Sequence, residues 1–218
     1  MQVCNEDFEN YSDENKGYQN GVGGILDHKY PVLCLGNFGT EIMKNCRILG
    51  QSHMNYTTDL YPQNTGPSKV KIGTAGVMWN SYALWITGGA NEEGSQGYKN
   101  TRFVKKHGKE MIWSRELPYP VSHHCLVKLD SNTFVLIGGK NYAFDVYVLE
   151  WSYEKNIQGP STLFPRHSGF GCVVFHKYGT PIVMVAGGAA SDSDTEGQST
   201  VELLERGSNQ WVEGAFMF

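Results

Sequence analysis

Short, almost entirely apolar runs recur along the chain, and each of them ends in glycine. The runs occupy residues 32–35, 84–87, 134–137 and 182–186, and they lead into Gly36-Asn37, Gly88-Gly89, Gly138-Gly139 and Gly187-Gly188. A run of this length that is apolar on both faces indicates a buried β-strand rather than a helix. The first glycines recur at a period of roughly 50 residues, which indicates a chain built of repeated units.

Each run is the second strand in a unit of four predicted strands. Strand-like segments precede it at residues 21–26, 74–79, 122–127 and 169–175, and others follow it at residues 45–49, 101–104, 144–149 and 201–204. An outer strand closes the unit around an aromatic residue, Trp113 in the second unit and Trp211 in the fourth. One such sheet cannot bury both faces alone, so the pattern predicts sheets stacked radially as propeller blades. We expect the glycine-ended strand to lie close to the axis, where backbones crowd.

These features resemble kelch repeats, whose unit joins a Pro-Arg pair, an apolar run into Gly-Gly and a later tryptophan. The fourth unit matches best, with Pro165-Arg166, Gly187-Gly188 and Trp211 in that order. The resemblance covers about residues 20–218 and implies an all-β, kelch-type β-propeller of about four blades, each of four antiparallel strands. The blades are expected at about residues 20–65, 66–118, 119–163 and 164–218. Residues 1–19 are expected to form an acidic arm, or else residues 8–18 supply an outer strand.

The number of units is small for this family. Kelch proteins usually close a ring of about six or seven blades, and an unclosed array exposes sheet faces and edges. We therefore expect a fragment of a longer ring, a tight four-bladed ring, or self-association with another copy. The fragment is the favoured interpretation.

Charge and hydropathy narrow the range of partners. The 218 residues carry a formal net charge of −4 without a basic patch, so nucleic acid is not an expected partner. No apolar run reaches roughly 18 residues, so no membrane span is predicted. Residues 1–20 lack the apolar core of a signal peptide. The compartment stays unknown, with an extracellular location favoured over a cytoplasmic one.

Five cysteines are too few and too irregular to predict a disulfide framework. Cys34 and Cys46 fall on the second and third strands of one unit, so a disulfide between them is geometrically allowed, with two buried thiols as the alternative. Some extracellular kelch-like proteins carry a similar pair. Cys125 and Cys172 are expected to be core residues.

No catalytic, metal or cofactor site is predicted. His123 and His124 are adjacent on a predicted strand, so their side chains point to opposite faces and do not grip one metal. Residues 192–197 resemble the opening of a calcium loop, but Leu203 stands where the loop requires glutamate, so a solvated loop is expected. Galactose oxidase shares the kelch fold and uses copper, yet no tyrosine and cysteine of this chain match that role.

The predicted function is that of a non-enzymatic scaffold which binds another protein through loops at the blade ends. Two of these loops are acidic, so a basic partner segment is expected. The candidate binding residues are Glu92, Glu93, Tyr98, Arg166, Asp192, Asp194 and Glu196. The alternatives are a kelch-fold enzyme, either an oxidase or a sugar-modifying enzyme, and a fragment of a ubiquitin-ligase substrate-adaptor propeller.

Overall fold

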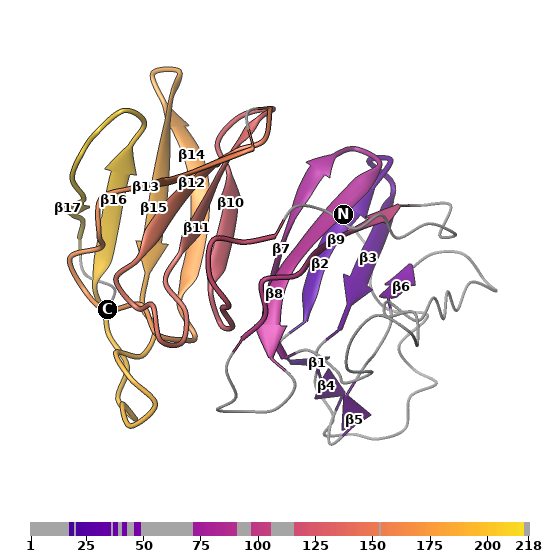
Figure 1. The fold of residues 1–218 in the computed structure, drawn as a ribbon, viewed down its shortest axis with the longest axis horizontal. Helices are drawn as coiled ribbons and strands as arrows, with labels where there is room; N and C mark the ends of the chain where they lie inside the picture. Colours follow the sequence, from indigo (N-terminus) through magenta and orange to yellow (C-terminus); the bar gives the residue numbers. More distant parts are fainter. Residues whose placement is uncertain are drawn as a thin grey trace.

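The computed structural model describes residues 18–19, 21–35, 37–38, 41–42, 46–48, 72–90, 97–105, 116–152 and 154–215. Within these ranges there is no helix, and the strands form five antiparallel sheets. Four of the sheets lie side by side in chain order (Figure 1). The predicted all-β class is confirmed, and the arrangement of the four sheets is β-propeller-like.

The four sheets each begin with a hairpin whose second strand leads toward the glycines. The first sheet contains β2 (Val22–Leu26), β3 (Tyr30–Cys34) and β6 (Cys46–Ile48), and the second contains β7 (Ile72–Asn80), β8 (Ala83–Ala90) and β9 (Thr101–Lys105). The third contains β10 (Cys125–Lys128), β11 (Thr133–Ile137), β12 (Val146–Glu150) and β13 (Lys155–Gln158). The fourth contains β14 (Gly171–Lys177), β15 (Thr180–Ala186), β16 (Val201–Glu205) and β17 (Val212–Glu213).

A fifth, smaller sheet joins β1 (Tyr18–Gln19), β4 (Asn37–Phe38) and β5 (Glu41–Ile42). Its first strand lies inside the segment that was expected to be an acidic arm. Tyr18 and Gln19 pair with Phe38 and Asn37, so the end of that segment belongs to a sheet. Residues 1–17 lie outside the described part of the chain.

The backbone turns sharply where the second strand of each sheet ends. Gly88, Gly138 and Gly187 have φ of 58°, 59° and 67°, a conformation in which glycine carries no steric penalty. In the first sheet the residue after the strand is Leu35, and its φ is 59°. The structure therefore differs from the prediction that Gly36 occupies this position, and Gly36 itself lies outside the described residues.

The first strand of each sheet, not the second, lies nearest the common centre. β2 contacts β7, β7 contacts β10 and β10 contacts β14, while the second strands lie one place further out. The expected reason for the glycines is thus wrong. The crowding comes from the linker to the next sheet, because the amides of Gly89 and Gly139 donate to the carbonyls of Val121 and Arg166 at 2.8 Å.

The core consists of three apolar clusters, each between consecutive sheets. Cys34, Leu84 and Ile86 belong to the cluster between the first and second sheets. The second cluster is aromatic, and the rings of Trp79 and Trp85 lie 5.0 Å and 4.9 Å from that of Phe134. The third cluster, between the third and fourth sheets, contains Trp211 and several valines, and the Trp211 indole donates to the Pro160 carbonyl at 2.9 Å. Trp113 lies outside the described residues.

Two disulfides join the four described cysteines in pairs. Cys34 and Cys46 are direct cross-strand partners on β3 and β6, and a disulfide connects them within the first sheet. A second disulfide connects Cys125 on β10 with Cys172 on β14. Cys125 and Cys172 were expected to be unbonded core residues. They do pack at the edge of the third cluster, but as a covalent link between two sheets.

Candidate functional site

A buried ion pair fixes the glycine-ended edge of the fourth sheet. Arg166 and Glu202 have no exposed side-chain surface, and the Arg166 guanidinium donates to Glu202 Oε1 through Nε at 3.0 Å and Nη2 at 2.6 Å. Arg166 Nη1 also donates to the Gly187 carbonyl at 2.6 Å. Glu202 accepts the amides of Leu163 at 2.5 Å and Phe164 at 3.2 Å. One pair thus connects the linker, the turn after β15 and strand β16.

This arrangement changes the assignment of Arg166. It was expected among the residues that contact a partner, on the face formed by the linkers. Burial and the hydrogen bonds donated by all three guanidinium nitrogens make Arg166 a structural residue, since a buried charge needs such partners. Glu202, its partner, was not singled out by the sequence, because a glutamate on a strand gives no signal of burial by itself.

The loop after Gly187 and Gly188 closes on one of its own acidic residues. Asp194 accepts hydrogen bonds from the amides of Ala190 at 2.7 Å, Gly197 at 3.0 Å and Glu196 at 3.2 Å. These bonds, that from Ala190 first, lower the pKa of the Asp194 carboxyl. Asp194 was expected to bind a partner, but its carboxylate serves the fold of the loop. Glu196 is exposed beside it.

Asp192 in the same loop forms the centre of a polar cluster. Its carboxylate accepts a hydrogen bond from Lys140 Nζ at 2.7 Å, and its second oxygen lies 3.8 Å from His167 Nε2. The hydrogen bond from Lys140 is the main reason why the pKa of Asp192 is lowered. The Lys140 side chain is 8% exposed and that of Asp192 67% exposed, so the cation is held below an accessible anion.

The cluster is assembled from three separate segments at one end of two sheets. Lys140 directly follows Gly139 in the third unit, His167 directly follows Arg166, and Asp192 lies four residues beyond Gly188. Only Asp192 was a predicted site residue. The signal that points to Lys140 and His167 is their position, because each stands next to a residue of the repeat motif.

The other predicted residues are distributed unevenly. Tyr98 is half-buried and forms a bridge with Val121, and its amide donates to the Gly89 carbonyl at 2.9 Å, so its backbone is joined to the glycine turn of the second sheet. Glu92 and Glu93 lie outside the described residues. The structure therefore brings together Asp192, Lys140 and His167, and it gives no common site to all of the residues that were predicted.

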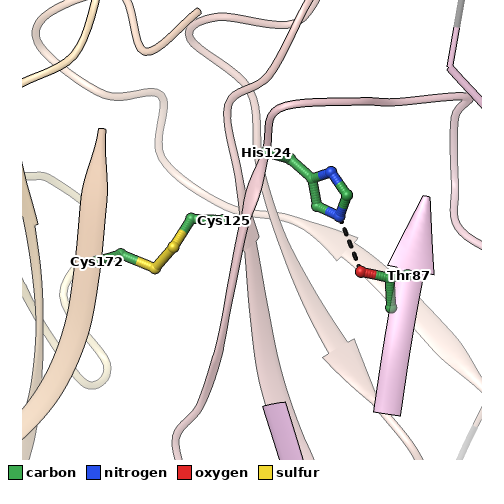
Figure 2. Close-up of a disulfide and its surroundings, with 4 residues drawn as sticks. All are labelled: Thr87, His124, Cys125 and Cys172. Atoms are coloured by element: carbon green, nitrogen blue, oxygen red, sulfur yellow. Dashed lines mark hydrogen bonds between the residues drawn. A yellow bond between two sulfur atoms is a disulfide. The ribbon is translucent and has the colours of Figure 1, made fainter. Parts of the chain in front are cut away.

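His124 and Cys125 point to opposite faces of the third sheet, as Figure 2 shows. His124 Nε2 lies 2.8 Å from Thr87 Oγ1 of the second sheet, while Cys125 reaches the fourth sheet through its disulfide. His124 Nδ1 is buried without a partner among the described residues. Burial lowers the pKa of His124 to about 3, so the ring is neutral and structural.

The contacts at this edge are ion pairs and hydrogen bonds that hold its loops in place. Among the described residues, no three His, Cys, Asp or Glu side chains come together as metal ligands. No helix within the described ranges has the length and hydropathy of a membrane span. What the glycine-ended edge offers is a set of charged and hydrogen-bonding groups on rigidly supported loops, which suits recognition.

Comparison with known proteins supports the fold alone. No known protein family matches the sequence, and no curated protein does so either. Among solved structures the chain is similar to the structure of YjhT, with a TM-score of 0.62 and 12% sequence identity. The similarity covers 91% of this chain and 66% of the YjhT chain, so this chain spans slightly less than two thirds of that length.

Proposed function

We propose that this chain is a non-enzymatic protein-binding scaffold built of about four kelch-type propeller blades. The kelch assignment is supported by the three Gly-Gly pairs, whose first glycines all adopt a positive φ at the end of a second strand. It is also supported by the role of Arg166, which ties its linker to the glycine turn of the same unit. In both cases a residue of the repeat motif has a structural role in this chain.

The observation that carries the proposal is the accessible carboxylate of Asp192 on an internally braced loop. Lys140 holds one carboxylate oxygen, and Asp194 and the Arg166–Glu202 pair hold the loop and its base. A surface that is already rigid loses little conformational entropy when a partner binds. Because Asp192 and Glu196 are both exposed and acidic, the partner we propose is a protein segment carrying lysine or arginine.

The two disulfides support an oxidising location for this interaction. Four of the five cysteines are paired, and disulfides persist mainly in extracellular and other oxidising compartments. We therefore propose an extracellular partner.

The test is a selection of displayed peptides on the purified chain, followed by calorimetry on the enriched peptides. We expect enrichment of basic segments and a dissociation constant that rises about tenfold in Asp192→Asn and in Glu196→Gln. Asp130→Asn is the matched control, since Asp130 lies in the turn between β10 and β11, at the other end of the third sheet.

Two results would count against the proposal. Enriched peptides without basic residues, or equal binding to wild type and Asp192→Asn, would move recognition away from this surface. Turnover in a screen of sugars and alcohols, with and without copper, would favour the enzyme alternative instead.

A further inference from the structure

Two large apolar side chains are exposed where the third sheet meets the linker to the fourth. Phe144 is 46% exposed in the loop between β11 and β12, and Leu163 is 50% exposed in the linker between β13 and β14. The Thr162 amide donates to the Phe144 carbonyl at 3.1 Å, so the two side chains stand on backbone segments that are hydrogen-bonded to each other. One exposed leucine would be ordinary, but two apolar side chains brought together from separate segments form a candidate contact area.

The backbone that carries this apolar pair, Phe144 and Leu163, is held in place by buried groups. The Leu163 amide donates to the buried carboxylate of Glu202 at 2.5 Å. The amide of Arg166, whose side chain is also buried, donates at 2.6 Å to the carbonyl of Ala143, the residue before Phe144. The exposure of the pair therefore follows from how the linker is anchored in the fold.

The acidic residues proposed to contact a basic partner lie on the other side of the same linker. Gln198 Nε2 donates to the Pro165 carbonyl at 2.8 Å, and this bond joins the loop of Asp192 and Glu196 to the linker. Asp192 Oδ2 also lies 3.8 Å from Nε2 of His167 in the linker. The linker thus runs between the apolar pair and the acidic loop.

The acidic residues alone make a weak contact. An ion pair between exposed side chains contributes little to affinity, because water screens it and both side chains lose conformational freedom. Charges mainly guide association and select the partner, whereas apolar side chains that become buried supply most of the binding free energy. The apolar pair is the nearby described surface that can supply this second contribution.

We propose that one protein segment binds across the linker and carries a bulky apolar residue close to a lysine or arginine. This inference rests on the proposed function and specifies its partner. The basic residue pairs with Asp192 or Glu196, and the apolar residue covers Phe144 and Leu163. Leu163 and His167 are four residues apart, which is at most about 14 Å of chain. An extended partner segment spans this length with about four residues, so its apolar and basic residues are expected within about four positions of each other.

The test is a displayed peptide library in which one position is fixed as arginine and the flanking positions are random. Selection on the wild-type chain should enrich leucine, methionine, phenylalanine and tryptophan within about four positions of the arginine. Selection on the double variant Phe144→Ser with Leu163→Ser should lose this apolar preference. A matched library with glutamine at the fixed position shows whether arginine itself is required.

Calorimetry on the enriched peptides separates the two contributions. Leu163→Ser and Phe144→Ser should each raise the dissociation constant about tenfold, equally at low and high salt, because salt does not screen apolar contacts. The loss in Asp192→Asn should shrink at high salt. Tyr82→Ser is the control, since Tyr82 is 64% exposed in the turn between β7 and β8, at the opposite end of the sheets. The three serine variants replace exposed side chains and should keep the wild-type circular dichroism.

The possible failures of this inference and of the proposed function are distinct. Peptides that require arginine but show no apolar preference would overturn this inference and leave the proposed function in place. Unchanged affinity in both single serine variants would have the same meaning. Equal selection from the arginine and glutamine libraries would overturn both, because no basic residue would then be recognised.

Discussion

At the scale of single residues, the buried ion pair between Arg166 and Glu202 holds together the glycine-ended edge of the fourth sheet. Arg166 was singled out by the repeat pattern as a binding residue, and only its contacts with Glu202 and Gly187 reveal that its role is structural. Its partner could not be inferred from the sequence, because Glu202 is one of two glutamates on β16 and only the fold reveals that it points inward. Lys140 and His167 stand beside residues of the repeat motif, but they were missed because their contacts with Asp192 join segments far apart in the chain.

Replacing Glu202 should be costly. Glu202→Gln leaves Arg166 charged and buried, and we expect the free energy of unfolding to fall by about 3–5 kcal/mol. Glu205→Gln on the same strand is the control, because Glu205 is exposed, and its effect should stay within about 0.5 kcal/mol. Denaturant titration of both variants measures the difference. Equal midpoints would mean that the pair contributes nothing to stability.

His124 should make the fold sensitive to acid. Burial lowers the pKa of His124 from 6.5 to about 3. Between these pH values the histidine is therefore protonated in the unfolded chain and neutral in the folded chain. Stability contributed by the neutral ring is complete above pH 6.5 and is lost as pH falls, by up to about 1.4 kcal/mol per pH unit.

Unfolding curves at pH 6.5 and pH 5 measure this effect, since few carboxylates titrate in that window. In His124→Gln the decrease between the two pH values should be smaller than in the wild type. His176→Gln, at an exposed position on β14, should retain the full wild-type decrease. A decrease that is unchanged in His124→Gln would assign the acid sensitivity to other groups.

At the scale of the strand and turn, the sequence predicted the hairpins well and the reason for their glycines poorly. Buried runs and turn residues are local signals, and they located β8, β11 and β15. The position of the glycines near a linker is not local, since it depends on how the next unit returns across the sheet. The one-residue displacement at Leu35 has the same origin, because a left-handed turn can be imposed on leucine by the contacts around it.

A pair of glycine variants separates backbone conformation from crowding. Gly139 and Gly207 both have positive φ, 104° and 84°, but a Cβ on Gly139 would lie 2.5 Å from Val121 Cγ2, whereas one on Gly207 meets nothing within 4 Å. We expect Gly207→Ala to cost about 1 kcal/mol and Gly139→Ala roughly 3 kcal/mol, measured by chemical unfolding. Similar losses in the two variants would show that conformation alone requires glycine.

At the scale of the whole molecule, each sheet is stable only beside its neighbours. The three apolar clusters all lie between sheets. The apolar residues that repeat along the chain therefore form the strands of each sheet and also the contacts between neighbouring sheets. The all-β class could be predicted from the apolar runs, the turn residues and their repeat spacing together. The link between Cys125 and Cys172 could not, because the spacing of cysteines does not reveal which strands become neighbours.

The disulfide between sheets should stabilise more than the one within a sheet. Cys125 and Cys172 are 47 residues apart and Cys34 and Cys46 are 12 apart, so the former restricts the unfolded chain more. Loop entropy predicts about 4 kcal/mol for the longer loop and about 3 kcal/mol for the shorter one. Paired serine variants, Cys125→Ser with Cys172→Ser and Cys34→Ser with Cys46→Ser, test the order by denaturant unfolding. Thiol titration of the unfolded wild type before and after reduction should reveal four additional thiols, and fewer would contradict one of the pairings.

The position of the apolar clusters also determines how the polypeptide must be made. During synthesis each new unit leaves the ribosome with an exposed apolar face. The next unit covers this face only when roughly 50 further residues have been translated. The growing chain therefore carries one exposed apolar face at any time, and this face belongs to the unit translated last. A chaperone that binds exposed apolar surface is expected to shield this face until the next unit has folded beside it.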